Sequence, residues 1–396
     1  MANTILTPTA VTRKALAILH QKLTFVGSIN RQYDKQYAVE GAKIGSDLKI
    51  RLPNQYAIRD GATLSTQDTV EQSTTLQVTT QKGVDLNFSS AELTLDLQDF
   101  ADRILEPAMA VLAANIEADV LNMRKEVYNI VDNDGSALTF LNIMQGRGQL
   151  NDNLAPMDSK RCALLSTDHN IALVDTLKGL FQDSTQVAKQ YREGFMGRTA
   201  GMMFSESTLA DDHQTGTAAK TTGYLVNGAS EAGSVVAVDT GSTTFLEGDI
   251  VTFAGCNRVH PETKTDTGKL QTFVVTADYS GSGDMPISPA IVTSGARQNV
   301  TGSPTNNGAV VKVGAAANGL YSGSLVYHKD AFTFATADLI KPKGVDFCAR
   351  EVYDGISIRI VRDYDINNDN LPCRLDVLYG KKAIRPQIAC RVHADG

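Results

Sequence analysis

The acidic run Asp363–Asp369, in the segment DYDINNDN, has the spacing that comes nearest to a metal site in this sequence. Oxygen-bearing side chains alternate along it as the ligands of a calcium loop do; they are Asp363, Asp365, Asn367 and Asp369. A calcium loop needs glycine at its sixth position and a bidentate acid at its twelfth, where this sequence has Asn368 and Arg374. We therefore interpret the run as a polar, Asn-rich turn and expect no bound metal.

Motifs of catalysis are absent from the rest of the sequence. None of the six histidines forms an HxH or HExxH pair, and neither a GxSxG elbow nor a phosphate-binding P-loop occurs. Gly146-Arg147-Gly148 is a lone GxG, which is typical of a turn. The five cysteines include no CxxC pair, which favours free, mostly buried thiols. We expect neither an enzyme nor a cofactor.

Composition is that of an ordinary globular chain, with 396 residues of which 42% are hydrophobic and 20% charged. No apolar run approaches the roughly 20 residues that span a bilayer, so no membrane partner is expected. The first residues lack the charged and apolar regions of a secretory signal, which favours a protein made and kept in a cytoplasm.

Charge is unevenly distributed along the chain. The net charge is −7, but residues 1–60 contain nine basic and four acidic residues. Arg13, Lys14 and Lys22 lie on or beside a short amphipathic helix that is predicted between Thr7 and Gly27. These charges indicate either an anionic partner for this basic segment or a solvated helix face.

A strand-rich stretch follows. Leu48, Ile50 and Leu52 alternate with Lys49 and Arg51, which predicts a half-buried strand. After it comes a Thr- and Gln-rich stretch with almost nothing to bury, and alternation resumes only toward Phe88. Such a long stretch without a core of its own predicts packing on something outside the chain.

A long helix and a mixed segment come next. Pro107 suits a first helical turn, and apolar residues then recur at three- and four-residue steps as far as Val131. We predict a helix over 107–131, stopped by Asp132–Gly135, and mixed α/β structure over 140–215.

An all-β module is predicted from about Thr221 to Ala335, where Gly, Thr, Val and Ser dominate and no helical period occurs. Gly248-Asp249 should form a tight turn, with Val251 and Phe253 on one inward face. Mixed patterning returns after it and closes in two alternating segments around Gly380. The module therefore reads as an insertion into one domain.

This order of elements resembles the Hong Kong 97-type major capsid proteins of tailed bacteriophages. Gly248-Asp249, Phe253-Ala254-Gly255 and Phe273-Val274-Val275 resemble the inserted β-barrel of the phage P22 coat branch. The segments 106–123 and 373–386 resemble its spine helix and its closing peripheral strands. The resemblance covers essentially the whole chain and rests on structural motifs.

The resemblance implies an α+β fold whose parts follow one another along the chain. They are an N-terminal arm (1–40), an extended β-loop (41–89), a peripheral domain (90–160 and 371–396) with its spine helix, an axial domain (161–222 and 336–370) and the inserted barrel (223–335). Ile50, Arg51, Leu52 and Arg59 would then make loop contacts with a neighbouring subunit. Gly248, Asp249, Val251, Phe253 and Gly255 would form the turn and core of the barrel.

The function that the resemblance implies is self-assembly into an icosahedral shell around double-stranded phage DNA, bound without sequence specificity. Partners would be copies of the chain as hexamers and pentamers, a scaffolding protein and a portal protein at one vertex. Arg13, Lys14 and Lys22 would face scaffold or DNA, and the protein would be assembled in the host cytoplasm and located in the virion. The alternative is a β-rich adhesin or tail-type protein that recognises a surface ligand through residues 221–335.

Overall fold

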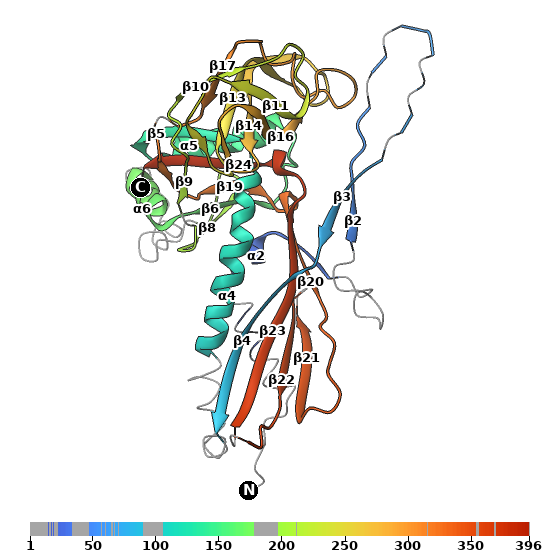
Figure 1. The fold of residues 1–396 in the computed structure, drawn as a ribbon, viewed down its shortest axis with the longest axis vertical. Helices are drawn as coiled ribbons and strands as arrows, with labels where there is room; N and C mark the ends of the chain where they lie inside the picture. The colour runs from blue at the N-terminus through green and yellow to red at the C-terminus, as the bar shows by residue number, and fades with distance from the viewer. Residues whose placement is uncertain are drawn as a thin grey trace. The chain divides into compact units, whose positions relative to one another are not determined.

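The computed structural model describes four long stretches of the chain and three residues before them. The described residues are Ala15, Ala17, Leu19, 23–33, 47–89, 106–177 and 197–395. Within these stretches, the following positions are not described: 57, 60, 65, 67, 70, 211, 315, 354, 355, 368 and 369. Arg13, Lys14 and Lys22 lie outside the described residues. The chain divides into two compact units; the first comprises 1–50, 73–121 and 332–382, and the second comprises 51–72, 122–331 and 383–396 (Figure 1).

The first unit is built on a six-stranded sheet. Its strands follow the order β1 (Asn30–Tyr33), β20 (Phe332–Ala337), β23 (Asn370–Ala383), β22 (Ile356–Arg362) and β21 (Phe347–Tyr353), and β4 (Thr80–Ser89) also pairs with β23. Helix α4 (Glu106–Leu121) lies beside β4 (Figure 1), where the ammonium of Lys82 donates to the carbonyl of Asn115 over 2.9 Å. The short helix α2 (Phe25–Ser28) packs on α4.

Strand β4 corrects the predicted extent of the extended loop. It is antiparallel to β23 over its whole length, with Thr80 opposite Tyr379 and Ser89 opposite Asn370. Its residues alternate between exposed and half-buried, as the sequence pattern required. The loop predicted to reach residue 89 therefore ends before β4, because the apolar alternation from residue 80 onward is satisfied within this unit.

Helix α4 is shorter than the predicted helix 107–131. Its buried face includes Met109, Leu112, Ile116 and Val120, after which the chain tightens into a 3-10 helix, η4 (Asn122–Glu126). The residues predicted to end the helix lie instead within β5 (Ile130–Ala137). The buried β-branched residues at its start suit a strand paired in parallel with β24 better than a helical turn.

Strands β2 (Asp47–Leu52) and β3 (Gln72–Gln77) form a separate two-stranded sheet. Near it, Leu76 and Val78 join a small apolar cluster with Leu378 and residues of β20, and Ile50 packs against this cluster. Gly380 lies inside β23 and not in a break between two segments, contrary to the prediction. A Cβ at Gly380 would lie 2.1 Å from the carbonyl oxygen of Gln77, so this close approach needs glycine.

The second unit contains another six-stranded sheet. Its order is β5, β24 (Ala389–Asp395), β19 (Leu325–His328), β6 (Arg161–Leu165), β8 (Met202–Glu206) and β7 (Arg198–Thr199). Helix α5 (Phe140–Asp152) packs on β24, β19 and β5, and α6 (Thr167–Leu177) contacts α5. Short 3-10 helices, η5 (Lys329–Ala331) and η6 (Pro386–Ile388), contact each other.

These pairings correct two predicted domain assignments. The prediction placed residues 389–395 in the peripheral domain, together with 90–160. It placed residues 336–370 in the axial domain, together with 161–222. In the structure β24 pairs with β19 in the sheet of β6, whereas β20, β21 and β22 share the sheet of β23 and β4. A strand's alternation specifies which face is buried but not which strand lies beside it.

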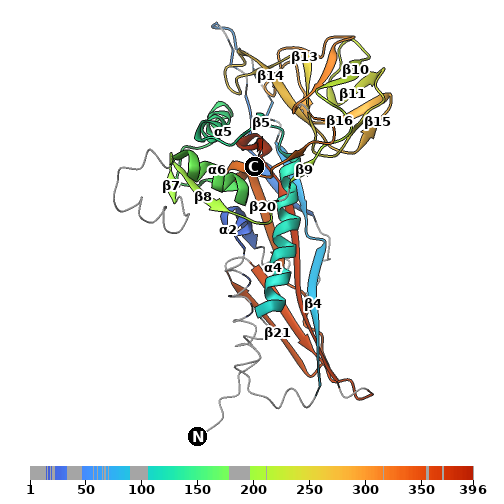
Figure 2. The same cartoon turned by 90° about the vertical axis from the view of Figure 1, so that its left-hand side faces the viewer.

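A closed barrel interrupts the second unit (Figure 2). Its strands are β10 (Thr221–Val226), β11 (Gly233–Asp239), β16 (Gly283–Ile291), β14 (Asp266–Val275), β13 (Ile250–Val259) and β17 (Ala309–Lys312), in that order. Two small sheets accompany it, β12 (Thr244–Phe245) with β15 (Tyr279–Ser280) and β9 (His213–Gln214) with β18 (Leu320–Tyr321). The predicted boundary at residue 335 is too far along the chain, because β19 and β20 pair in the two larger sheets. None of the helices in the described part of the chain is long and apolar enough to span a membrane.

Candidate functional site

The first candidate site is the loop between β2 and β3, where four contact residues were predicted. Ile50 is half-buried and packs on the apolar cluster of its own unit. Arg51 pairs with Glu71 over 3.6 Å with both side chains well exposed, and Leu52 is half-buried. The Arg59 guanidinium donates to the carbonyl oxygens of Gly61 and Thr63, which fixes the turn at the far end of the loop.

The same loop carries apolar side chains that the predicted set missed. Ile58 is 90% exposed, Leu64 is 78% exposed and Tyr56 is 58% exposed. No local periodicity marks these residues, because they stand singly in a polar stretch. The available signal was their presence in a loop that has almost nothing of its own to bury.

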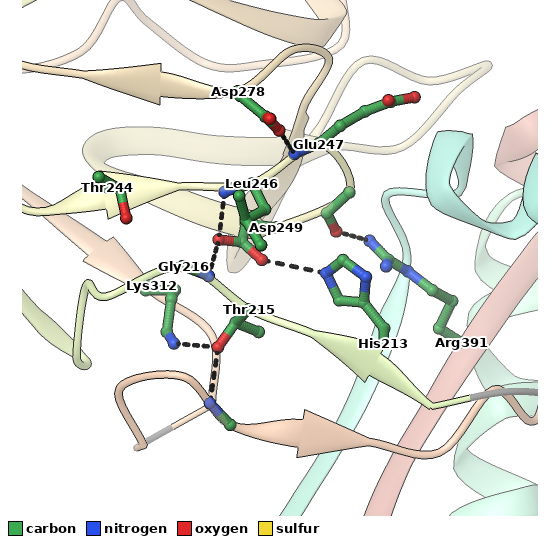
Figure 3. A network of polar contacts seen from close by, with 12 residues as sticks. His213, Thr215, Gly216, Thr244, Leu246, Glu247, Asp249, Asp278, Lys312 and Arg391 are labelled. Atoms are coloured by element: carbon green, nitrogen blue, oxygen red, sulfur yellow. Dashed lines mark hydrogen bonds and ion pairs between the residues drawn. The ribbon is translucent and has the colours of Figure 1, made fainter.

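The second candidate site lies at the base of the barrel, around the turn predicted at Gly248-Asp249 (Figure 3). The amide of Asp249 donates to the carbonyl of Leu246 over 3.0 Å, closing a tight turn between β12 and β13. The Asp249 carboxylate, 1% exposed, accepts hydrogen bonds of 3.0 Å from His213 Nε2 and from the amides of Gly216 and Leu246. The Asp249 carboxylate thus links this turn to strand β9 and to the chain segment that follows β9.

Two buried cations complete this group. Arg391, from β24, donates from Nη2 to the carbonyl oxygen of Gly248 over 2.7 Å (Figure 3). Lys312, from β17, donates from Nζ to the Thr215 hydroxyl over 3.0 Å and to the carbonyl of Ala316 over 2.7 Å. The barrel is therefore attached to the strands that flank it through a buried polar cluster, which we call the barrel anchor: His213, Thr215, Gly248, Asp249, Lys312 and Arg391.

Burial controls the charges in the barrel anchor. It lowers the pKa of His213, an effect that the bond to Asp249 opposes, so this contact is a hydrogen bond from a neutral imidazole rather than an ion pair. Burial also lowers the pKa of Arg391 to about 9 and lowers that of Lys312, while Asp249 favours the charged form of each. Arg391 therefore remains protonated near neutral pH and is attracted to the Asp249 carboxylate.

The remaining predicted barrel residues lie where the pattern requires. Val251 and Phe253 are fully buried on the inward face, with the Phe253 and Phe273 rings 5.4 Å apart. Gly255 has φ +87°, and a Cβ there would lie 2.6 Å from the Thr305 hydroxyl oxygen. Cys256 beside it is buried, which raises the pKa of its thiol to about 12 and suits an inert core residue.

A second contact joins the barrel to helix α5. Arg258 on β13 donates to the Gln149 side-chain oxygen over 2.8 Å and to the Asp152 carboxylate over 2.6 Å. Neither this contact nor the buried His213, Lys312 and Arg391 was predicted. No local pattern reveals these pairings, because the partners lie in other elements, 36 positions away for His213 and 143 for Arg391.

Metal chemistry has no support among the described residues, which contain no group of three or more His, Cys, Asp or Glu able to hold a metal ion. Of the acidic run, residues 363–367 are described, and the amide of Asp365 donates to the carbonyl of Asn370 over 2.8 Å. The interpretation of the whole run as a polar turn stays a prediction.

An α+β chain with two sheets, a long helix and an inserted barrel has the organisation of a phage major capsid protein. A model of the family described as "P22 coat protein - gene protein 5" matches residues 26–391. The chain therefore belongs to the P22 coat protein family, whose members are structural proteins of the phage shell.

Three of the similar solved structures have phage titles. The structure titled "Mycobacterium phage Che8" is 11% identical, covers 93% of this chain and 90% of its own, and has a TM-score of 0.49. The asymmetric unit of the bacteriophage PhiM1 mature capsid is 12% identical, with coverages of 93% and 86% and a TM-score of 0.44. The capsid structure of the cyanophage P-SCSP1u is 10% identical, with coverages of 93% and 86% and a TM-score of 0.43. None of the curated protein sequences matches the chain.

Proposed function

We propose that this coat protein assembles with copies of itself, as hexamers and pentamers, into an icosahedral shell around double-stranded DNA. A scaffolding protein and a portal protein at one vertex would take part, and assembly would proceed in the host cytoplasm. The observation that carries the self-assembly is the set of exposed apolar side chains on the loop between β2 and β3. These are the groups that a neighbouring copy would bury.

The loop supports this proposal because it has little to hold it within its own chain. A two-stranded ribbon is marginally stable in water, and the ion pair between Arg51 and Glu71 is too exposed to contribute much. Burying an apolar side chain against a neighbour contributes about 1.5–3 kcal/mol. Many such contacts, each modest, make a stable shell while single contacts remain reversible.

The parts of the chain take the roles of the capsid fold in this proposal, with the corrected boundaries. Residues 47–77 form the extended loop, 80–126 with 332–383 form the peripheral domain, and 130–214 with 320–331 and 389–395 form the axial domain. The basic residues of the arm, Arg13, Lys14 and Lys22, face first an acidic scaffold segment and later DNA. Charge contacts at a solvated surface are weak and screened by salt, so the scaffold would be able to leave.

The test replaces Ile58 and Leu64 together with Asp. Both side chains are exposed in the single chain, so the variant should keep the parent's circular dichroism spectrum and melting temperature. It should fail to form shells, because each contact would bury an unpaired charge at a cost of several kcal/mol. Sedimentation and negative-stain microscopy measure the yield of closed particles.

The matched control changes Ile58 to Val and Leu64 to Met, which keeps apolar groups at the same two positions. This control should assemble as the parent does. Closed shells in normal yield from the Asp double variant would rule out the loop as the contact that drives assembly.

A further inference from the structure

A small basic pocket lies in the second unit, away from the loop and from the barrel anchor. Its volume is about 210 Å³, and three of its lining residues are arginines from different elements. Arg147 comes from α5, Arg161 is the first residue of β6, and Arg198 is the first residue of β7. Ser159 and Asp158 from the loop before β6 also line it.

Arg161 is the arginine of this pocket whose position is fixed by the surrounding chain. Arg161 is only 2% exposed, and three hydrogen bonds fix the orientation of its guanidinium group. Nε donates to the carbonyl of Pro156 over 2.8 Å, Nη1 to the side-chain oxygen of Asn151 over 2.7 Å, and Nη2 to the carbonyl of Ala155 over 2.6 Å. All three acceptors are neutral, so they orient the guanidinium without neutralising its charge.

The other two arginines add charge that the pocket does not balance. Within the part of the chain that the structure describes, neither Arg147 nor Arg198 has a hydrogen bond or an ion pair to a carboxylate. Gly201, in the turn after β7, brings that turn against α5, since a Cβ there would lie 3.9 Å from Nη2 of Arg147. Burial and then the neighbouring Arg147 lower the pKa of Arg161, which indicates that the two guanidinium groups repel each other.

Asp158, the one carboxylate among the described lining residues, already has partners. Asp158 Oδ1 accepts from His328 Nε2 over 3.0 Å, and its Oδ2 lies 3.7 Å from the Lys160 ammonium. Three guanidinium groups therefore face one engaged carboxylate, which leaves an excess of positive charge in a small space. Repulsion of this kind is relieved by an anion.

We propose that this pocket binds a phosphate group. Planar guanidinium forks match the oxygens of phosphate, and arginines are the residues best suited to hold it. The volume corresponds to roughly seven water molecules at about 30 Å³ each, which is enough for a group of five heavy atoms. The exposed Ser159 hydroxyl offers one further donor.

The phosphate group has two sources, free phosphate or the backbone of a nucleic acid, and the second rests on the proposed enclosure of DNA. The experiment titrates the full, unassembled chain at low salt with inorganic phosphate, with a ten-nucleotide single strand of thymidines, and with citrate. Isothermal titration calorimetry measures each affinity. Because the chain is unassembled, binding is measured independently of shell formation.

The parent chain should bind phosphate saturably at one site, and the double variant Arg147→Gln, Arg198→Gln should bind it about a hundredfold more weakly, about tenfold for each arginine. Competition by the oligonucleotide assigns the site to nucleic acid, and its absence assigns it to free phosphate. Citrate should bind much more weakly than phosphate.

The matched control removes the same number of charges elsewhere, through Lys269→Gln with Lys343→Gln, two exposed lysines outside the pocket. It should bind phosphate as the parent does. If the double variant does not fold, Arg198→Gln, at an exposed position, carries the test alone with a tenfold loss. The proposal is overturned if the parent shows no saturable phosphate binding, if citrate binds equally well, or if the variant and the control weaken binding equally.

Discussion

His393 illustrates what a single buried residue contributes to this protein. It is 3% exposed, and its ring stacks on that of Tyr321 with the centroids 4.6 Å apart. Burial holds the pKa of His393 well below its usual value, and the neighbouring charge of Arg391 acts in the same direction. The imidazole is therefore neutral in the folded chain at neutral pH, and its protonation at lower pH destabilises the folded state relative to the unfolded state.

The pH dependence of stability follows from this direction. In the unfolded chain His393 takes up a proton below about pH 6.5, whereas in the folded chain it does so only at lower pH. The unfolded state then binds more protons, so the free energy of unfolding falls as the pH falls below 6.5. Near pH 5.5 this residue should cost on the order of 1 kcal/mol.

The variant His393→Phe keeps the ring stack and removes the titrating group. Urea unfolding of the unassembled chain at pH 7.5 and at pH 5.5 measures the loss of stability for parent and variant. We expect the loss to be smaller in the variant, by on the order of 1 kcal/mol. Equal losses in both proteins would show that His393 does not titrate as its burial requires.

Helix α4 positions the segment that precedes the first sheet. Glu117, on its buried face, accepts hydrogen bonds from the backbone amides of Phe25 and Val26 in α2, the second over 3.2 Å. Burial raises the pKa of Glu117, and the two amide donors oppose that shift. Because α2 has four residues, its place on α4 depends on this carboxyl group and on the apolar packing of Phe25.

We predict that Glu117→Ala lowers the free energy of unfolding by about 2–4 kcal/mol, because two buried amides lose their acceptor. The residues before β1 should also become susceptible to limited proteolysis. Glu106→Ala, at the exposed start of the same helix, is the control and should change stability by less than about 0.5 kcal/mol. A Glu117 variant as stable and as protease-resistant as this control would contradict the role of the carboxyl group.

The barrel is an insertion whose entering and leaving chain segments are paired with each other; we call this pair of segments the neck. The amide of Thr215 donates to the carbonyl of Gly319, and the amide of Asn318 to the carbonyl of Gly216, each over 2.9 Å. These bonds join the two chain segments that enter and leave the barrel. The barrel core is closed and contains its own aromatic and β-branched residues, so it satisfies the requirements of an independent folding unit.

Residues 213–321, which include both neck strands, should therefore fold when expressed alone. We expect a β-type circular dichroism spectrum and one cooperative thermal transition. In this fragment Phe253→Ala should cost about 3–5 kcal/mol and abolish the transition, whereas Val235→Ala, at a partly exposed position, should leave it in place. A disordered spectrum from the unmodified fragment would mean that the barrel depends on the rest of the second unit.

Local sequence patterns were sufficient for the elements whose residues interact with near neighbours. The two-residue period of apolar side chains identified the strands over 48–52 and 84–88 and the inward pair Val251 and Phe253. It does so because alternate side chains of a strand point to the same face, so a strand buried on one face has apolar residues at every second position. Glycine and turn chemistry identified the tight turn at Gly248-Asp249. The resemblance to capsid proteins extended this to the order of the parts.

Partners distant in the sequence were decided by the tertiary structure. The helix predicted to Val131 ends at Leu121 because Ile130 and Val131 pair with β24, a strand some 260 residues further on. Likewise, Arg391 is buried against the carbonyl of Gly248, 143 positions away. The sequence alone determines which apolar residues of a strand share a buried face, since side-chain chemistry and local period suffice for that. The strands that cover these faces, and buried charges such as Arg391, are selected by packing over the whole chain, which no local pattern records.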